Sequence, residues 1–214
     1  LDVPPATDAD DDPARAHVHG FHTYPARMHP ITAGRLVRAF GAGRVLDPFC
    51  GSGTVLVEAL AAGRPATGTD LNPLAVRLAA CKTRPRRPAQ LERLVAAPAA
   101  CAEEAGGFAA KLFVGRARDL AARLSAFRLL LPDPVPPATV AEDDATELRR
   151  LPPGFVGAVI TSPPYAATYD YLAHHALRLR WLGLDPGPLA RGEIGSRAAY
   201  ARLRPADARA AWCR

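Results

Sequence analysis

The sequence predicts an α/β fold with a mostly parallel sheet, and three consecutive features support this prediction. A short apolar strand, Val45–Leu46, ends at an acid, Asp47. A sharp turn at Gly51–Gly53 follows, and an apolar helix pattern begins directly afterwards at Thr54. Strand, glycine turn and helix in this order form the nucleotide-binding element of Rossmann-like folds. We therefore expect a Rossmann-like sheet with helices on both faces.

The chain before and after this element is expected to supply further helices and a second strand. Residues 1–16 are rich in proline, aspartate and alanine, which predicts a flexible lead-in to a domain at 17–214. Residues 31–40 show the apolar spacing of a helix. A second strand at 65–70 ends in an acid, and a helix is expected to begin at Asn72-Pro73.

The second half of the chain predicts an insertion and two more strands. Residues 89–131, approximately, have a helical pattern and form a helical insertion between the second and third strands. The third strand is expected at 138–141 and the fourth at 155–161, an apolar run typical of a strand buried on both faces. A helix at 170–182 follows. Because only four strands are evident and the chain begins with Leu rather than Met, we expect an incomplete sheet, a truncated C-terminal part and a fragment of a longer protein.

Composition limits the classes of function. With 214 residues and 49% hydrophobic residues, the chain suits one domain with a real core. Its net charge of +6 suits a polyanionic partner such as DNA, although a GC-rich genome would also explain the abundance of arginine. The cysteines form no Cys-x-x-Cys pair, so we expect reduced thiols and a cytoplasmic location. We find no run of about 20 apolar residues and no signal peptide.

Acids at the strand ends indicate the kind of ligand. Asp47 would repel a pyrophosphate and attract a cationic ligand, which points to S-adenosylmethionine. The main chain at Gly51 and Gly53 would leave room for it. Asp70 lies 19 residues after Gly51 and is placed to bind ribose hydroxyls, with a helix cap as its alternative role. Asp144, after the third strand, is expected to reach the adenine amino group.

Three histidines near the N-terminus, His17, His19 and His22, suggest two alternatives. They could bind a metal ion, or they could pack as rings within a loop. We favour packing and expect no metal.

Taken together, three segments resemble the amino-group DNA methyltransferases. The segments are DPFCGSGT at 47–54, TDLNP at 69–73 and TSPPY at 161–165. This family transfers a methyl group from S-adenosylmethionine to N4 of cytosine or N6 of adenine, and SPPY is the form seen mostly in its N4-cytosine members. The YPAR segment at 24–27, the tyrosines at 169 and 171 and the later IGSR are also similar to this group.

The resemblance implies how the SPPY tetrapeptide acts. The Ser162 hydroxyl and the Pro163 carbonyl would accept hydrogen bonds from the target amino group and localise its lone pair. Pro163 and Pro164 hold the main chain rigid, so these acceptors need little reorganisation. Tyr165 would stack on a base that has been flipped out of the duplex.

The cofactor site is expected to combine both strand ends with the YPAR segment. The resemblance implies that Tyr24 and Pro25 close the pocket, although core packing explains Tyr24 equally well. The complete set of expected cofactor-binding residues is Tyr24, Pro25, Asp47, Pro48, Phe49, Gly51, Gly53, Thr54, Asp70 and Asp144.

These expectations lead to a site-specific N4-cytosine DNA methyltransferase. Two alternatives keep the same chemistry: an N6-adenine DNA methyltransferase and a tRNA guanine-N2 methyltransferase. A third is a non-catalytic or truncated remnant that binds nucleic acid. Expected partners are DNA rather than RNA and no membrane, with a restriction endonuclease or a second subunit as further candidates.

Overall fold

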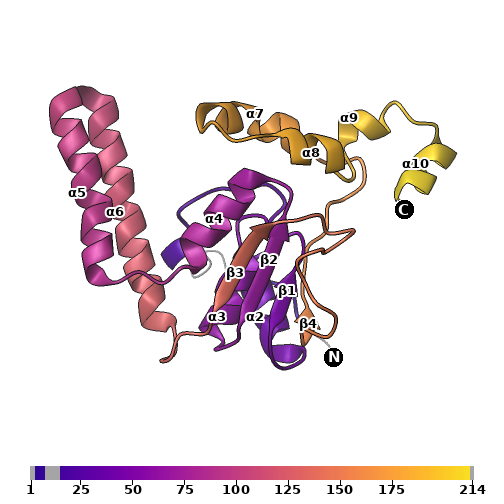
Figure 1. The fold of residues 1–214 in the computed structure, drawn as a ribbon, viewed down its shortest axis with the longest axis horizontal. Helices are drawn as coiled ribbons and strands as arrows, with labels where there is room; N and C mark the ends of the chain where they lie inside the picture. Colours follow the sequence, from indigo (N-terminus) through magenta and orange to yellow (C-terminus); the bar gives the residue numbers. More distant parts are fainter. Residues whose placement is uncertain (1–2, 8–14, 213–214) are drawn as a thin grey trace.

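A computed structural model describes residues 3–7 and 15–212, so much of the expected lead-in at 1–16 lies outside the described residues. Its centre is a parallel sheet in the order β3-β2-β1-β4 (Figure 1). The strands are β1 (Val45–Asp47), β2 (Ala66–Asp70), β3 (Ala138–Glu142) and β4 (Ala158–Val159). This confirms the expected Rossmann-like α/β fold. The strand order reverses between β1 and β4, which is where ligands bind in open parallel sheets.

Three helices form the layer beside the sheet: α2 (Pro30–Ala39), α3 (Thr54–Ala61) and α4 (Pro73–Thr83). α2 and α4 each begin with proline, and the Asn72 side chain caps α4 by accepting the Leu74 N–H at 3.0 Å. The layer and the sheet share a buried core: Ala33, Val37, Val45, Cys50, Val55, Leu56, Ala59, Ala66, Ala79 and Ile160.

Helices were expected on both faces of the sheet, but α3 and α4, which pack on it directly, share one face. The register aligns Leu46, Thr67 and Thr139 on the opposite face, where the two threonine hydroxyls are hydrogen-bonded at 3.0 Å. The guanidinium of Arg44 lies 4.7 Å from the ring centroid of Phe155. This part of the second face is therefore covered by the loop before β4.

The segment between α4 and β3 forms two helices, α5 (Pro88–Ala105) and α6 (Gly107–Leu130). They meet at Gly106, whose φ is 64°, and they form a hairpin that extends away from the sheet (Figure 1). The part of α6 nearest the sheet packs on α3 and on the short helix η2 (His17–His19) through a second core of Val18, Val57, Leu60, Leu124 and Phe127.

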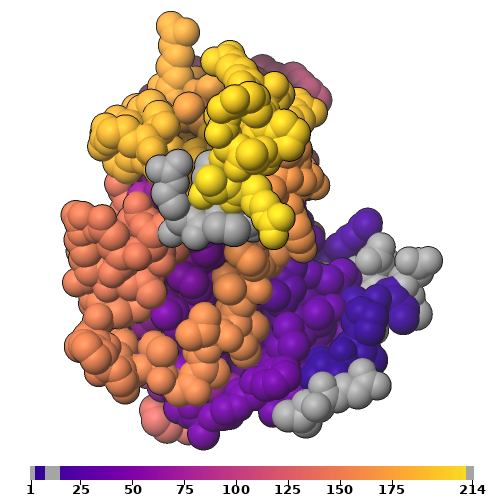
Figure 2. Space-filling model, turned by 90° about the vertical axis from the view of Figure 1, so that its right-hand side faces the viewer, coloured from indigo at the N-terminus to yellow at the C-terminus, as the bar shows by residue number. Residues whose placement is uncertain are grey.

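The region after β3 differs most from expectation. Only Ala158 and Val159 of the expected strand at 155–161 pair with β1, and Val159 is 58% exposed because β4 is an edge strand. Four helices follow: α7 (Tyr171–Trp181), α8 (Gly187–Gly192), α9 (Arg197–Tyr200) and α10 (Pro205–Trp212). In Figure 1, α7 and α8 lie over the edge at which the strands end, and α9 and α10 continue to one side toward the C-terminus. Figure 2 shows this C-terminal part, in light orange and yellow, at one end of the molecule. Within the described part of the chain, no helix is long and apolar enough to cross a membrane.

Candidate active site

A pocket lies at the carboxyl ends of the strands, where β1 and β4 are neighbours. Its walls come from three separate parts of the chain: the segment at 24–28, the loops after the strands, and residues 171 and 189–194. The loops after the strands contribute residues 47–52, 54–55, 70–72, 143–145, 162 and 164. One cavity thus collects residues that are far apart in the sequence.

A side-chain hydrogen bond joins the two strand ends. The Thr161 hydroxyl donates to Oδ1 of Asp47 at 2.7 Å, and the Ile160 N–H donates to the Leu46 carbonyl at 3.0 Å. Asp47 and Ser162 consequently line the same pocket. This adjacency is the arrangement that a single cofactor and a single nucleobase would need.

Asp47 is a buried acid at the base of the pocket. It is 3% exposed and also accepts the Phe49 N–H at 3.2 Å. Burial raises the pKa of Asp47 to about 7, and the charge of Asp70 adds to this effect, while the hydrogen bonds from Thr161 and Phe49 oppose it. The charged form of Asp47 is therefore unfavourable in the absence of a ligand, and a cationic ligand would stabilise it.

Asp70 holds the glycine turn in place. Its carboxylate accepts the Gly51 N–H and the Asn72 N–H, each at 2.8 Å. Burial raises its pKa to about 6, although both hydrogen bonds oppose the shift. The helix cap that was considered as the alternative role of Asp70 belongs to Asn72 instead. The remaining lone pairs of the Asp70 oxygens are available to a ligand hydroxyl.

The two glycines of the turn have different surroundings. Gly51 has φ 49° and lines the pocket, and a Cβ added there would lie 3.2 Å from the Tyr24 ring. Gly53 has φ 82° and does not line it; an added Cβ would lie 2.9 Å from the Cβ of Ala79 on α4. Gly53, which we expected to leave room for a cofactor, instead leaves room for a neighbouring helix.

Tyr24 forms a wall of the pocket and also belongs to the core. It is 7% exposed, and its hydroxyl accepts a hydrogen bond from the Asn72 side-chain amide at 3.1 Å. Its ring stacks on that of His175 with centroids 5.0 Å apart. Tyr24 is therefore packed in the core and also lines the pocket.

Most of the expected site residues line the pocket. Those of the cofactor set are Tyr24, Pro25, Asp47, Pro48, Phe49, Gly51, Thr54, Asp70 and Asp144. Of the SPPY residues, Ser162 and Pro164 line it, whereas Pro163 and Tyr165 do not. Tyr165 is 59% exposed.

Sequence reasoning missed the third wall. Leu189, Glu193 and Ile194 line the pocket, and a carboxylate oxygen of Glu193 accepts the N–H groups of Tyr171 and Leu172, the latter at 3.2 Å. Burial raises the pKa of Glu193. Ile194 belongs to the IGSR segment, whose similarity pointed to this region, whereas no local pattern marks Leu189 or Glu193, which reach the pocket through the packing of the C-terminal helices. Thr161 and Asn72 could have been found, because each is part of a motif segment.

The arrangement has a definite chemical character. The carboxyl groups of Asp47 and Asp70 lie beside the glycine turn, and Ser162, which follows the neighbouring strand, lines the same cavity. Such a pocket suits a ligand that carries both a positive charge and hydroxyl groups, and it holds a second polar group close to that ligand.

Comparisons with known proteins find similarity to methyltransferases. Residues 23–105 match the family model described as "RMKL-like, methyltransferase domain". The chain is 40% identical over 82 residues to the type II methyltransferase M.MvaI of Kocuria varians, covering 36% of this chain and 18% of that protein. It is 38% identical over 68 residues to the type II methyltransferase M.MjaII of Methanocaldococcus jannaschii, covering 31% of this chain and 13% of that protein.

Among solved structures, an rRNA methyltransferase, aviRa from Streptomyces viridochromogenes, superposes with a TM-score of 0.45 and 22% sequence identity. The superposition covers 77% of this chain and 70% of that one. The sequence matches to the two type II proteins cover less than a fifth of either relative. Over these short segments, the chain is similar in sequence to type II methyltransferases, and residues 23–105, which contain the glycine turn, match a methyltransferase family model.

Proposed function

We propose that this chain carries the catalytic region of a DNA methyltransferase that transfers a methyl group from S-adenosylmethionine to the exocyclic N4 of cytosine. One observation carries the proposal: the 2.7 Å hydrogen bond between Thr161 and Asp47. It joins the end of the strand that would bind the cofactor to the end of the strand that would present the base. A cofactor and an extruded base could then meet in one cavity.

The pocket residues support S-adenosylmethionine as the methyl donor. The buried carboxyl of Asp47 would pair with the ammonium group of the methionine part, directly or through water. Asp70 would accept a hydrogen bond from a ribose hydroxyl, while Asp144 would reach the adenine amino group. When bound, the cofactor would supply a methyl group attached to a sulfonium. The neutral thioether that remains after transfer is a good leaving group.

The SPPY residues would prepare the amino group of the base. Its lone pair is delocalised into the ring, so it is a poor nucleophile until acceptors draw the nitrogen towards a tetrahedral shape. The Ser162 hydroxyl and the Pro163 carbonyl would serve as these acceptors, and the prolines keep them preorganised. The exposed ring of Tyr165 is available to stack on a flipped base, which is worth about 1–3 kcal/mol.

DNA is the proposed substrate because the relatives are type II methyltransferases and the chain has a net charge of +6. We propose action in the cytoplasm, with a restriction endonuclease or a second subunit as a partner. The test below distinguishes three alternatives: methylation of adenine N6 in DNA, methylation of guanine N2 in tRNA, and a remnant without activity.

The test uses nucleoside mass spectrometry. The purified chain is incubated with isotopically labelled S-adenosylmethionine and either DNA or tRNA, and the digested nucleosides are analysed. We expect labelled N4-methylcytosine from DNA. Label in N6-methyladenine or N2-methylguanine would overturn the proposed base, and no label in any nucleoside, despite cofactor binding in calorimetry, would support the remnant.

Two variants separate binding from transfer. Asp47→Ala should weaken cofactor binding at least about tenfold because it removes the charge partner of the ammonium group. Ser162→Ala should keep cofactor affinity and lose most of the methylation. Unchanged methylation by Ser162→Ala would contradict the acceptor role of its hydroxyl.

A further inference from the structure

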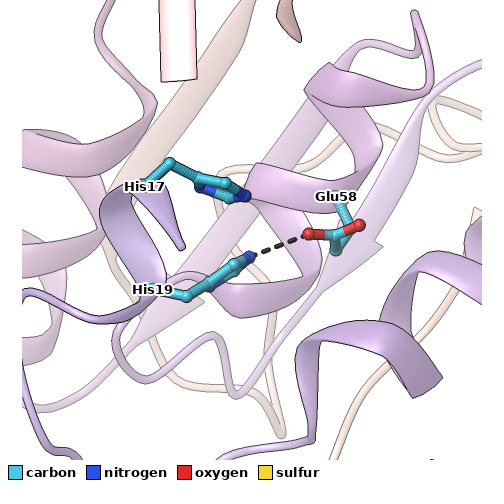
Figure 3. A group of neighbouring side chains, drawn as sticks. All are labelled: His17, His19 and Glu58. Carbon is cyan, nitrogen blue, oxygen red and sulfur yellow. Dashed lines mark hydrogen bonds and ion pairs between the residues drawn. The ribbon is translucent and has the colours of Figure 1, made fainter. Parts of the chain in front are cut away.

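Outside the pocket, three metal-ligating side chains converge from two elements. His17 and His19 lie on η2, Glu58 lies on α3, and one ligand atom from each lies within 4.8 Å of the other two. Figure 3 shows both rings directed toward the carboxylate of Glu58. Within the described ranges 3–7 and 15–212, no other group of three or more such side chains converges in this way.

The imidazole rings have nitrogen atoms that the protein does not use. Nε2 of His19 is 2.8 Å from Oε1 of Glu58, but Nδ1 of His19 and Nδ1 of His17 are buried without a hydrogen-bond partner. The unpartnered nitrogen atoms leave each ring with bonding capacity that the protein itself does not use.

Neighbouring groups hold the two histidines in place. The His17 ring stacks on Phe127 of α6 with centroids 5.5 Å apart. Arg123 donates to the His17 carbonyl at 3.0 Å, and Arg27 donates to the His19 carbonyl at 2.8 Å. His19 itself is only 1% exposed. The rings are thus preorganised, which lowers the entropic cost of binding an ion.

We propose that His17, His19 and Glu58 bind one transition-metal ion of the zinc class, with a fourth position open to water. Two histidines and one glutamate are a known three-residue ligand set for zinc. Zinc–ligand distances of about 2 Å place tetrahedral ligands about 3.4 Å apart, so ligand atoms up to 4.8 Å apart must approach by as much as about 1.4 Å, and the 2.8 Å hydrogen bond between His19 and Glu58 must open slightly. The Glu58 side chain, which is 13% exposed and hydrogen-bonded to His19, would have to turn about its side-chain bonds to make this movement.

The two imidazole ligands favour zinc-class ions over magnesium or calcium. Lys82 is buried with its Nζ unpartnered, and Arg27 and Arg123 are also near the histidines, so the local charge opposes any cation. Only an ion with a strong preference for imidazole overcomes this opposition, and hard ions that require several oxygen ligands do not.

The ion would have a structural role. It would fasten η2 to α3, the helix that follows the glycine turn, and η2 leads directly into Tyr24 and Pro25 of the pocket wall. An ion that binds only the folded state raises stability by mass action. Metal binding is therefore expected to raise the melting temperature, and it requires neither the cofactor nor a nucleic acid.

The first experiment measures metal binding by the full chain. After treatment with EDTA and removal of the chelator, the protein is titrated with Zn²⁺ by calorimetry. We expect one equivalent to bind, and Co²⁺ in its place to give the intense visible absorption of tetrahedral coordination. A chain that binds no Zn²⁺ would overturn the proposal, whatever the result of the methylation test.

Matched variants then test the ligands. Glu58→Gln keeps an acceptor for His19 and removes the anionic ligand, and His17→Gln removes one imidazole; both should lose the bound equivalent and the cobalt absorption. His22→Gln and His174→Gln should retain them, because neither residue belongs to the group. Retention of both signals by Glu58→Gln, or their loss in His22→Gln, would contradict the assigned ligands.

Discussion

At the scale of single residues, two buried acids dominate the pocket. Asp47 and Asp70 have raised pKa values, of about 7 and about 6, and burial is the main cause in both. Ionising them in the ligand-free protein is unfavourable because the charge is removed from water. A cationic ligand offsets this cost, so ligand binding and ionisation of Asp47 are coupled.

The coupling predicts that cofactor affinity depends on pH. Below about pH 7 Asp47 is mostly protonated, and binding a cation must release that proton. Affinity should thus rise with pH, by up to about tenfold per unit, and level off above pH 7. Calorimetry at several pH values between about 5.5 and 8.5 measures the profile. Asp47→Asn is the control, since it cannot ionise and should bind weakly with a flatter profile; an equally flat profile in the unaltered chain would contradict the coupling.

At the scale of elements, the close approach of α3 and α4 explains why position 53 in the turn is a glycine. Gly53 precedes α3 and has φ 82°, with Ala79 of α4 so near that a Cβ would lie 2.9 Å from its Cβ. Gly43 also has a positive φ, 72°, but no atom lies within 4 Å of a Cβ added there. Comparing Gly43 with Gly53 therefore distinguishes the effect of a positive φ alone from the added effect of close helix packing.

Gly53→Ala should therefore destabilise the fold more than Gly43→Ala. Both variants force alanine into a left-handed conformation, which costs about 1–2 kcal/mol. Gly53→Ala also pushes α3 and α4 apart, adding about 1–3 kcal/mol. Urea denaturation of both variants measures the difference. Equal losses would mean that α4 moves freely to accommodate the added methyl group.

At the scale of the whole molecule, the C-terminal helices complete the pocket. Leu189 and Ile194 line it, and Leu189 packs with Leu74, Leu179 and Leu184 in a third cluster of buried side chains. Glu193 ties this segment to the first turn of α7 through the N–H groups of Tyr171 and Leu172. The position of this wall depends on tertiary contacts between α4, α7 and the segment before α9.

Removing the tie should loosen the wall. Glu193→Ala loses both hydrogen bonds, so we expect cofactor affinity to fall by about threefold to tenfold while most of the fold is retained. Glu193→Gln keeps a carbonyl acceptor and should stay close to the unaltered chain. Calorimetry with S-adenosylmethionine compares the three proteins. Identical affinity in Glu193→Ala would show that the wall holds its position without this contact.

The sequence by itself determined the central part of the fold. The strands β1 and β2, the glycine turn, and the starts of α3 and α4 were predicted within one or two residues. These elements depend on local signals: apolar runs, glycines with positive φ, and a proline after a capping residue. The helical insertion at about 89–131, which the structure forms as α5 and α6, followed from the same kind of signal.

Only the tertiary structure decided which residues meet. The short β4, the role of Gly53, the wall at 189–194 and the convergence of His17 and His19 with Glu58 all depend on contacts between segments distant in the chain. From the sequence we favoured ring packing over a metal site for the three histidines, and Glu58 could not be added to them without α3 beside η2. Local patterns specify elements because backbone preferences act over a few residues, whereas a site is assembled by packing, which acts across the whole chain.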